Sequence, residues 1–138
     1  MRISARVSNQ HDRNMVDLQT GEHKHSLDIP AKANSRGSSV NGGELLFLAL
    51  ATCYCNDIYR EAGKRGIEVR SVEVEVSGEF GNEGEAARDI SYRAAVDAEA
   101  SREEILDLMR HTDSVAEIHN TLRNASKVVL SHCEAGEV

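Results

Sequence analysis

The stretch "NGGELLFLALATCYCNDIYREAGKRG", residues 41–66, decides the fold of this 138-residue chain. Asn41, followed three residues later by Glu44, is typical of the capping box at the start of a helix. Gly66 suits the left-handed backbone that commonly ends one. Residues 45–51 are apolar on every side of this predicted helix, whereas its second half is amphipathic. A helix that is apolar all round has to be covered all round, so we expect its first half to be buried, with a second subunit as one source of cover.

Strand patterns come before this helix. Apolar residues alternate with polar ones over residues 2–8, which predicts a half-buried strand. Two further patterns, at residues 15–19 and 23–30, lie on either side of a turn and predict a hairpin or meander. The glycine- and serine-rich residues 31–43 predict a loop that leads into the helix.

The segments after the helix complete an α+β pattern. Residues 67–80 and 88–96 predict an antiparallel hairpin, with a bulge where the apolar phase slips near Arg70 and Ser71. Ser101 and Glu104 form a second capping box, which predicts a short helix over residues 101–111. We expect a separate helix over residues 112–125, with a kink at residues 112–114, and a last strand at 126–131. This order predicts one α+β domain over residues 1–138.

Composition and charge exclude several classes of partner. The net charge of −7 leaves no basic surface for nucleic acid or for an anionic membrane. The apolar run is too short to span a bilayer, and the first residues lack the apolar core of a secretory signal. Three cysteines without a disulfide pattern fit a reducing compartment, so we expect a cytoplasmic protein.

Cysteine is the first candidate for chemistry. Cys53 lies about three turns into the predicted helix, beyond a strong helix-dipole effect, so its thiol needs a cation or a base from elsewhere in the fold. Without one, it is a small apolar core residue. Cys55 points to another side of the helix. His23 and His25 share one strand face but lack a third ligand, and no glycine pattern indicates a phosphate site, so we expect no metal and no cofactor.

Three segments resemble one known family. They are "NGGELLFLALATCY" (41–54), "GIEVRSVEVEVSGEF" (66–80) and "TDSVAEIHNTL" (112–122), and they are similar to the OsmC/Ohr proteins, the osmotically inducible and organic hydroperoxide resistance proteins. The resemblance covers nearly the whole chain. It implies an intertwined α+β homodimer, in which antiparallel sheets from both subunits wrap two long central helices. Such a dimer would cover a helix that is apolar on every side.

The resemblance also implies a site. In "ATCY", Cys53 takes the position of the thiol that attacks a hydroperoxide and becomes a sulfenic acid. An arginine from the N-terminal strands polarises this thiol in the family. Arg13 is the nearest match, with Arg6 and Arg36 as alternatives.

Two positions depart from the family pattern. The family loop reads Asn-Pro-Glu before the helix, and its Glu holds the Arg; here Gly42 and Gly43 stand at Pro and Glu. Glu44, one residue later, is the candidate for that role and equally a capping residue. The family's second cysteine lies in a Cys-Pro-x-Ser segment, where this chain has Ala116 and Glu117.

Three interpretations follow for Cys53. In the first, it reduces a hydroperoxide, and an external thiol or Cys133 then resolves the oxidised sulfur. In the second, the protein is not a peroxidase and binds a small apolar or electrophilic ligand at the dimer-interface pocket. In the third, the dimer is catalytically inactive and Cys53 is a core residue.

Overall fold

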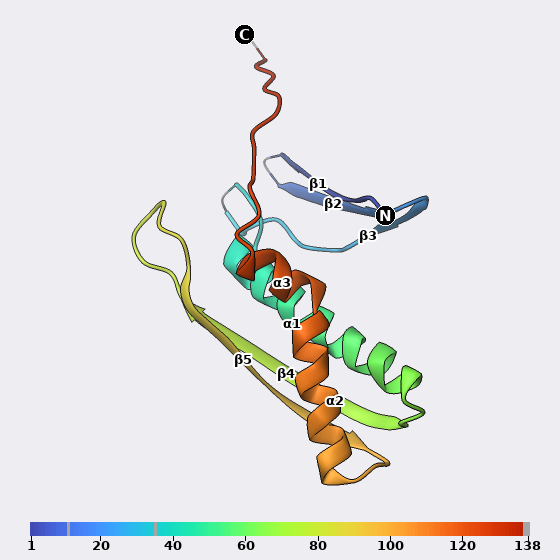
Figure 1. Ribbon diagram of the computed structural model, residues 1–138. Helices are drawn as coiled ribbons and strands as arrows, with labels where there is room; N and C mark the ends of the chain where they lie inside the picture. The colour runs from blue at the N-terminus through green and yellow to red at the C-terminus, as the bar shows by residue number, and fades with distance from the viewer. Residues whose placement is uncertain (11, 35, 137–138) are drawn as a thin grey trace. The chain divides into compact units, whose positions relative to one another are not determined.

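The computed structural model describes residues 1–10, 12–34 and 36–136. Contacts divide the chain into an N-terminal unit, Met1–Leu46, and a C-terminal unit, Phe47–Val138, which are described separately. Five strands in two antiparallel sheets and three helices make up the described chain (Figure 1). The predicted α+β class is therefore confirmed.

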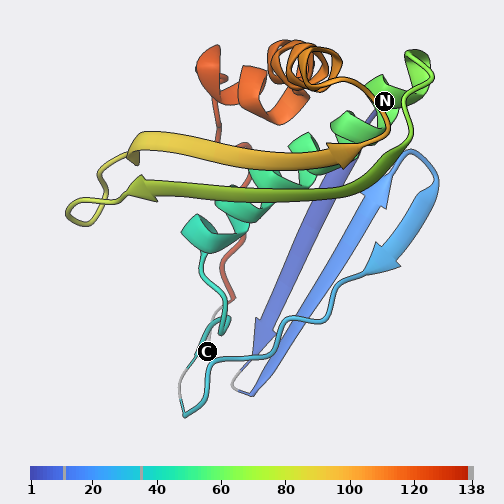
Figure 2. The same ribbon diagram turned by 90° about the horizontal axis from the view of Figure 1, so that it is seen from below.

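The N-terminal unit contains a three-stranded antiparallel sheet. Its strands are β1 (Ile3–Gln10), β2 (Arg13–Thr20) and β3 (His23–Ser26), which lie side by side in this order (Figure 2). Gly21 has a φ of 57° in the turn between β2 and β3, a backbone conformation that glycine adopts without steric cost. The predicted strands and the turn between them are present, but every residue of β1 is exposed, so the expectation of a half-buried first strand is wrong for the single chain, and β3 ends at Ser26 instead of continuing to residue 30.

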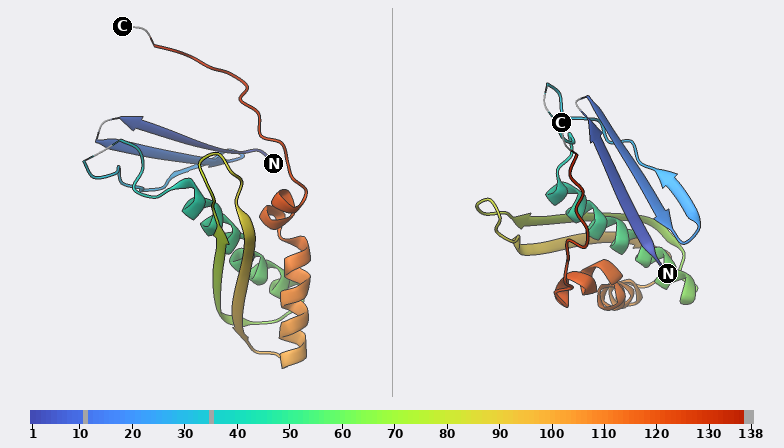
Figure 3. Two further views of the ribbon diagram at one scale, coloured as in Figure 1. Left: turned by 90° about the vertical axis from the view of Figure 1, so that its left-hand side faces the viewer. Right: turned by 90° about the horizontal axis from the view of Figure 1, so that it is seen from above.

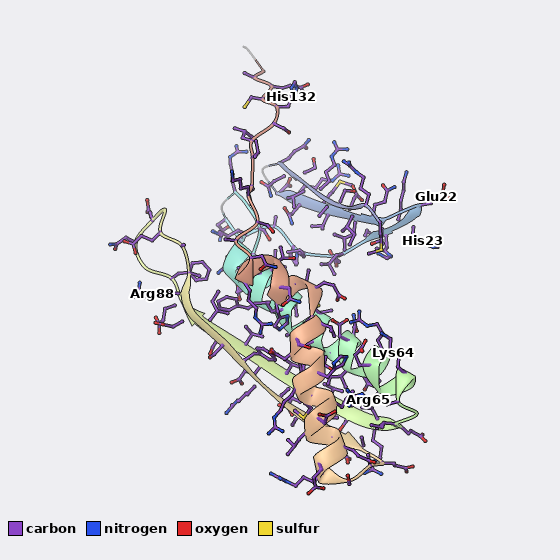
Figure 4. The ribbon with its side chains drawn as sticks, viewed as in Figure 1. Glu22, His23, Lys64, Arg65, Arg88 and His132 are labelled. Atoms are coloured by element: carbon purple, nitrogen blue, oxygen red, sulfur yellow. The ribbon has the colours of Figure 1, made fainter. Side chains whose placement is uncertain are left out.

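Helix α1 (Gly42–Lys64) begins and ends as its sequence predicts. The Glu44 N–H donates to Asn41 Oδ1 at 2.8 Å, and the Asn41 N–H donates to Glu44 Oε1 at 3.0 Å, which is a complete capping box. At the other end, Gly66 has a φ of 68° and the Ile67 N–H donates to the Ala62 carbonyl at 3.0 Å. Lys64 lies in the last turn and Arg65 follows it, where the helix dipole favours basic side chains (Figure 4).

The first half of α1 is less covered than its composition predicts. Leu50 is 4% exposed, but Leu48 on another side of the helix is 55% exposed. The expectation of a fully buried first half is therefore wrong for the single chain. Among the described helices, none is both long enough and apolar enough to pass through a bilayer.

In the C-terminal unit, two helices cover one face of a hairpin. Strands β4 (Val69–Glu79) and β5 (Arg88–Ala98) are antiparallel, and their register shifts between Val69 and Ser71, which confirms the predicted bulge. Helix α2 (Arg102–Val115) starts at the Ser101 capping box. The core consists of Tyr54, Ile58, Ala62 and Leu108 against inward-facing strand residues that include Val72, Val74, Ala94 and Val96.

The boundary between the last two helices is not where the sequence predicted it. Helix α2 continues through Thr112 and Ser114, and α3 (Glu117–Arg123) begins only after a break at Ala116 (Figure 3). The polar side chains do not cap a new helix. Thr112 Oγ1 donates to the Leu108 carbonyl at 2.8 Å, and Ser114 Oγ donates to the His111 carbonyl at 2.6 Å. These hydroxyls are satisfied inside the helix, so they do not end it.

The predicted last strand is also wrong for the described chain. Residues 126–131 form no strand, and Val128 is 99% exposed. A strand needs a neighbour to pair its backbone N–H and C=O groups, and no described strand pairs with this segment.

Candidate functional site

The candidate site of the C-terminal unit is centred on Cys53, a half-buried residue in the middle of α1. Its Sγ lies 3.5 Å from Asp57 Oδ2, one turn further along the same helix. It also lies 3.9 Å from Glu117 Oε1, at the first residue of α3. The thiol therefore faces two carboxylates, one from each helix.

Arg60 holds these two carboxylates from the side away from the sulfur. Its Nη1 lies 3.1 Å from Asp57 Oδ1 and 2.9 Å from Glu117 Oε2. The spacing of three residues between Asp57 and Arg60 places both on the same face of α1. Because Arg60 occupies one oxygen of each carboxylate, the other oxygen of each remains directed at Cys53.

An ion-pair cluster around the buried Glu61 fixes Arg60 in turn. Its Nε donates to Glu61 Oε2 at 2.8 Å, and Lys64 Nζ donates to the same oxygen at 3.0 Å. His111 Nε2 lies 3.0 Å from Glu61 Oε1. The hydrogen bonds from Arg60 and Lys64 lower the pKa of Glu61 to about 2. A carboxylate that is 4% exposed thus stays ionised because basic groups surround it.

The electrostatics of the site favour the neutral thiol. Burial, followed by the charges of Asp57 and Glu117, raises the pKa of Cys53 above its ordinary value, while a hydrogen bond from the Ile118 backbone acts in the opposite direction. Burial also raises the pKa of Asp57, and its hydrogen bond with Glu117 raises it further. The two carboxylates are therefore well suited to share and exchange a proton next to the sulfur.

The same three donors could in principle hold a metal ion. Donor atoms of Cys53, Asp57 and Glu117 all lie within 4.8 Å of one another. However, the Arg60 guanidinium already supplies a positive charge to both carboxylates. A divalent ion would add a second positive charge beside this guanidinium. The charges of the cluster are therefore better balanced when the carboxylates exchange a proton than when they bind a metal ion.

Of the residues predicted from the sequence, Cys53 lies in this cluster, whereas Arg13 and Glu44 belong to the N-terminal unit. Arg13 is the first residue of β2, and Glu44 completes the capping box of α1. Their predicted roles toward Cys53 stay predictions. Cys55 and Cys133 are free thiols, half-buried and exposed respectively.

Sequence reasoning missed three members of the cluster: Asp57, Arg60 and Glu117. A signal for the first two was present, because Asp57 lies four residues after Cys53 and Arg60 three residues after Asp57, spacings that share a helix face. Glu117 was noticed only as a departure from the family pattern. Its contact with α1 depends on how α3 packs, which no spacing reveals.

Comparisons with known proteins agree on one family. The sequence profile described as "OsmC-like protein" matches residues 35–131. Similar structures include an OsmC-like protein from Mycoplasma pneumoniae (18% identity, 87% of each chain covered, TM-score 0.60). Another is an OsmC-like protein of unknown function from Vibrio cholerae (15% identity, 88% of this chain and 93% of that chain, TM-score 0.61). The organic hydroperoxide resistance protein OhrB of Bacillus subtilis is also similar (16% identity, 87% and 90%, TM-score 0.53). Comparison with curated proteins finds no match.

Proposed function

Because the chain belongs to the OsmC-like protein family, we propose that it is a thiol-dependent redox protein in which Cys53 reduces organic hydroperoxides. The observation that carries the proposal is the contact of the Cys53 sulfur with Asp57 and Glu117, at 3.5 and 3.9 Å. It gives the thiol a proton acceptor in the position that the reaction needs. Solved structures of hydroperoxide resistance proteins with the same fold support this choice of substrate class.

The first step forms an S–O bond and breaks the O–O bond of the hydroperoxide. The Cys53 sulfur attacks the terminal oxygen with an electron pair, and its proton passes to the carboxylate pair of Asp57 and Glu117. The leaving alkoxide takes a proton back from this pair and departs as an alcohol. The sulfur is oxidised to a sulfenic acid and the peroxide is reduced, so a thiol and a hydroperoxide give a sulfenic acid and an alcohol.

An external low-molecular-weight thiol completes the cycle in this proposal. It condenses with the sulfenic acid to a mixed disulfide and releases water; a second thiol then attacks this disulfide and frees Cys53. This route requires no second cysteine at Ala116. Cys133, which is exposed, is the alternative partner within the chain.

The resemblance contributes the remaining parts of the proposal. We assign to Arg13 the role of polarising Cys53, and to Glu44 that of holding this Arg, within one OsmC-like domain over residues 1–138. The working unit is a homodimer in the cytoplasm. The 55% exposure of the apolar Leu48 on α1 supports a subunit contact at this helix.

The experiment follows the consumption of cumene hydroperoxide by the full chain with dithiothreitol as reductant. We expect Cys53→Ser to abolish turnover, whereas Cys55→Ser and Cys133→Ser, the matched controls, leave most of it. Mass spectrometry with a sulfenic acid trap should locate the adduct on Cys53. If Cys53 remains a thiol while the other cysteines oxidise, or if Cys53→Ser keeps the wild-type rate, the proposal is wrong.

A further inference from the structure

The C-terminal unit contains a cavity of about 240 Å³ between α1, the β4–β5 hairpin and α3. Most of its wall is apolar and consists of Leu50, Val76, Ile90 and Leu122. Tyr92, His119 and Arg123 complete the lining. A mainly apolar cavity with a few polar groups is the usual form of a small-molecule site.

His119 is the unusual member of this lining. It is 5% exposed, and among the residues that the structure describes neither of its ring nitrogens has a hydrogen-bond partner. A buried polar group without a partner costs free energy, and native proteins rarely leave one. Its ring packs edge-on against Tyr92, with 4.7 Å between ring centroids, so its position is fixed by packing.

The protonation state of His119 limits what it can bind. Burial, and then the positive charge of Arg123, lower the pKa of the imidazole, which is therefore neutral at neutral pH. A neutral imidazole offers one N–H donor and one nitrogen acceptor. It is a partner for a neutral hydroxyl group and gives an anion little electrostatic attraction.

The other polar groups of the lining already have partners. The Tyr92 hydroxyl donates to Asp113 Oδ1, and Arg123 Nη2 lies 2.8 Å from the same oxygen. Arg123 Nη1 donates to the Asp113 carbonyl at 2.9 Å. Among the polar groups of this lining, His119 is thus the one that still needs a hydrogen bond within the described chain.

We propose that this cavity binds a small apolar molecule carrying one hydroxyl group, which hydrogen-bonds to a ring nitrogen of His119 while its apolar body contacts Leu50, Val76 and Leu122. This inference goes beyond the proposed reaction, because it involves neither Cys53 nor its carboxylates. A carboxylate ligand is disfavoured, since Arg123 is already paired with Asp113 and His119 is neutral.

The experiment compares 1-naphthol with naphthalene, which lacks the hydroxyl, as probes for the full chain without peroxide. Binding is followed by fluorescence in wild type, His119→Leu and His119→Gln. We expect the ratio of the two affinities to shift against 1-naphthol by roughly three- to tenfold in His119→Leu, the value of one hydrogen bond. His119→Gln, which keeps a donor and an acceptor, should restore most of the preference. Val76→Phe should fill the cavity and weaken both probes.

A second measurement keeps the test valid if a variant does not fold. In wild-type protein labelled with ¹⁵N-histidine, 1-naphthol should shift the ring nitrogen resonances of His119, and those of the exposed His132 should stay in place. The proposal is overturned if neither probe binds saturably, or if 1-naphthol leaves the His119 resonances unchanged. It is also overturned if a folded His119→Leu protein keeps the wild-type affinity ratio.

Discussion

Replacing Glu117 with Gln should make Cys53 more reactive toward a simple alkylating agent. Glu117 Oε1 lies 3.9 Å from the sulfur, and its side chain is 60% exposed, so a water-like dielectric constant applies to this pair. At this distance, two negative charges repel by about 1 kcal/mol in water. Removing this repulsion should raise the thiolate fraction about fivefold at a pH below the thiol pKa, since about 1.4 kcal/mol corresponds to a factor of ten.

The assay is the rate of iodoacetamide alkylation, measured by intact mass between pH 7 and 10. The reference protein and each variant compared with it carry Cys55→Ser and Cys133→Ser, so that Cys53 is the single thiol. Glu103→Gln makes the same chemical change at an exposed residue of α2 and should keep the wild-type rate. A Glu117→Gln protein that reacts no faster than this control would show that the carboxylate does not govern ionisation of the thiol.

Three further changes test other parts of the molecule. Glu61→Gln should destabilise the fold in urea at pH 6. The pKa of Glu61 in the folded protein, about 2, lies below that of an unfolded Glu. The difference in stability between wild type and Glu61→Gln should therefore disappear as the pH falls toward 2. Gly78→Ala should lower the free energy of unfolding in urea by roughly 1–3 kcal/mol, because the new Cβ would lie 2.8 Å from Phe47 Cζ. Gly63→Ala, whose Cβ would have no atom within 4 Å, should be tolerated. Leu48→Asp should shift the proposed dimer toward monomer in sedimentation; an unchanged mass would exclude this helix face from the interface.

Local physical signals in the sequence were enough to predict most of the fold. The capping box at Asn41 and the left-handed Gly66 define α1, because each satisfies backbone groups at a helix end whatever lies around it. The bulge near Arg70 followed from a change in apolar phase, which is also a local property. Thr112 and Ser114 were misleading, because a hydroxyl can cap a new helix or bond within the old one. Only the packing of α2 against the hairpin decides between the two.

The candidate site shows the same division between local and long-range information. The resemblance singled out Cys53, but the groups that set its chemistry come from a helix face and from a segment 64 residues away. Such contacts depend on tertiary packing, which alternation and capping patterns do not encode. A residue that looked like a mere departure from the family pattern, Glu117, thus became one of the two groups in contact with the thiol.

The position of Glu117 also bears on how an oxidised Cys53 would be resolved. By resemblance, the start of α3 is where two-cysteine relatives carry their second thiol, and here the same segment brings a carboxylate to the sulfur. With Asp57 on the other side, a negatively charged thiol would meet two carboxylates whose charge Arg60 compensates only in part. Repulsion between like charges at about 4 Å favours a neutral or cationic reductant over an anionic one by about 1 kcal/mol in water. Having Ala116 and Glu117 where the relatives have Cys and Pro would therefore both move resolution to an external molecule and select its charge.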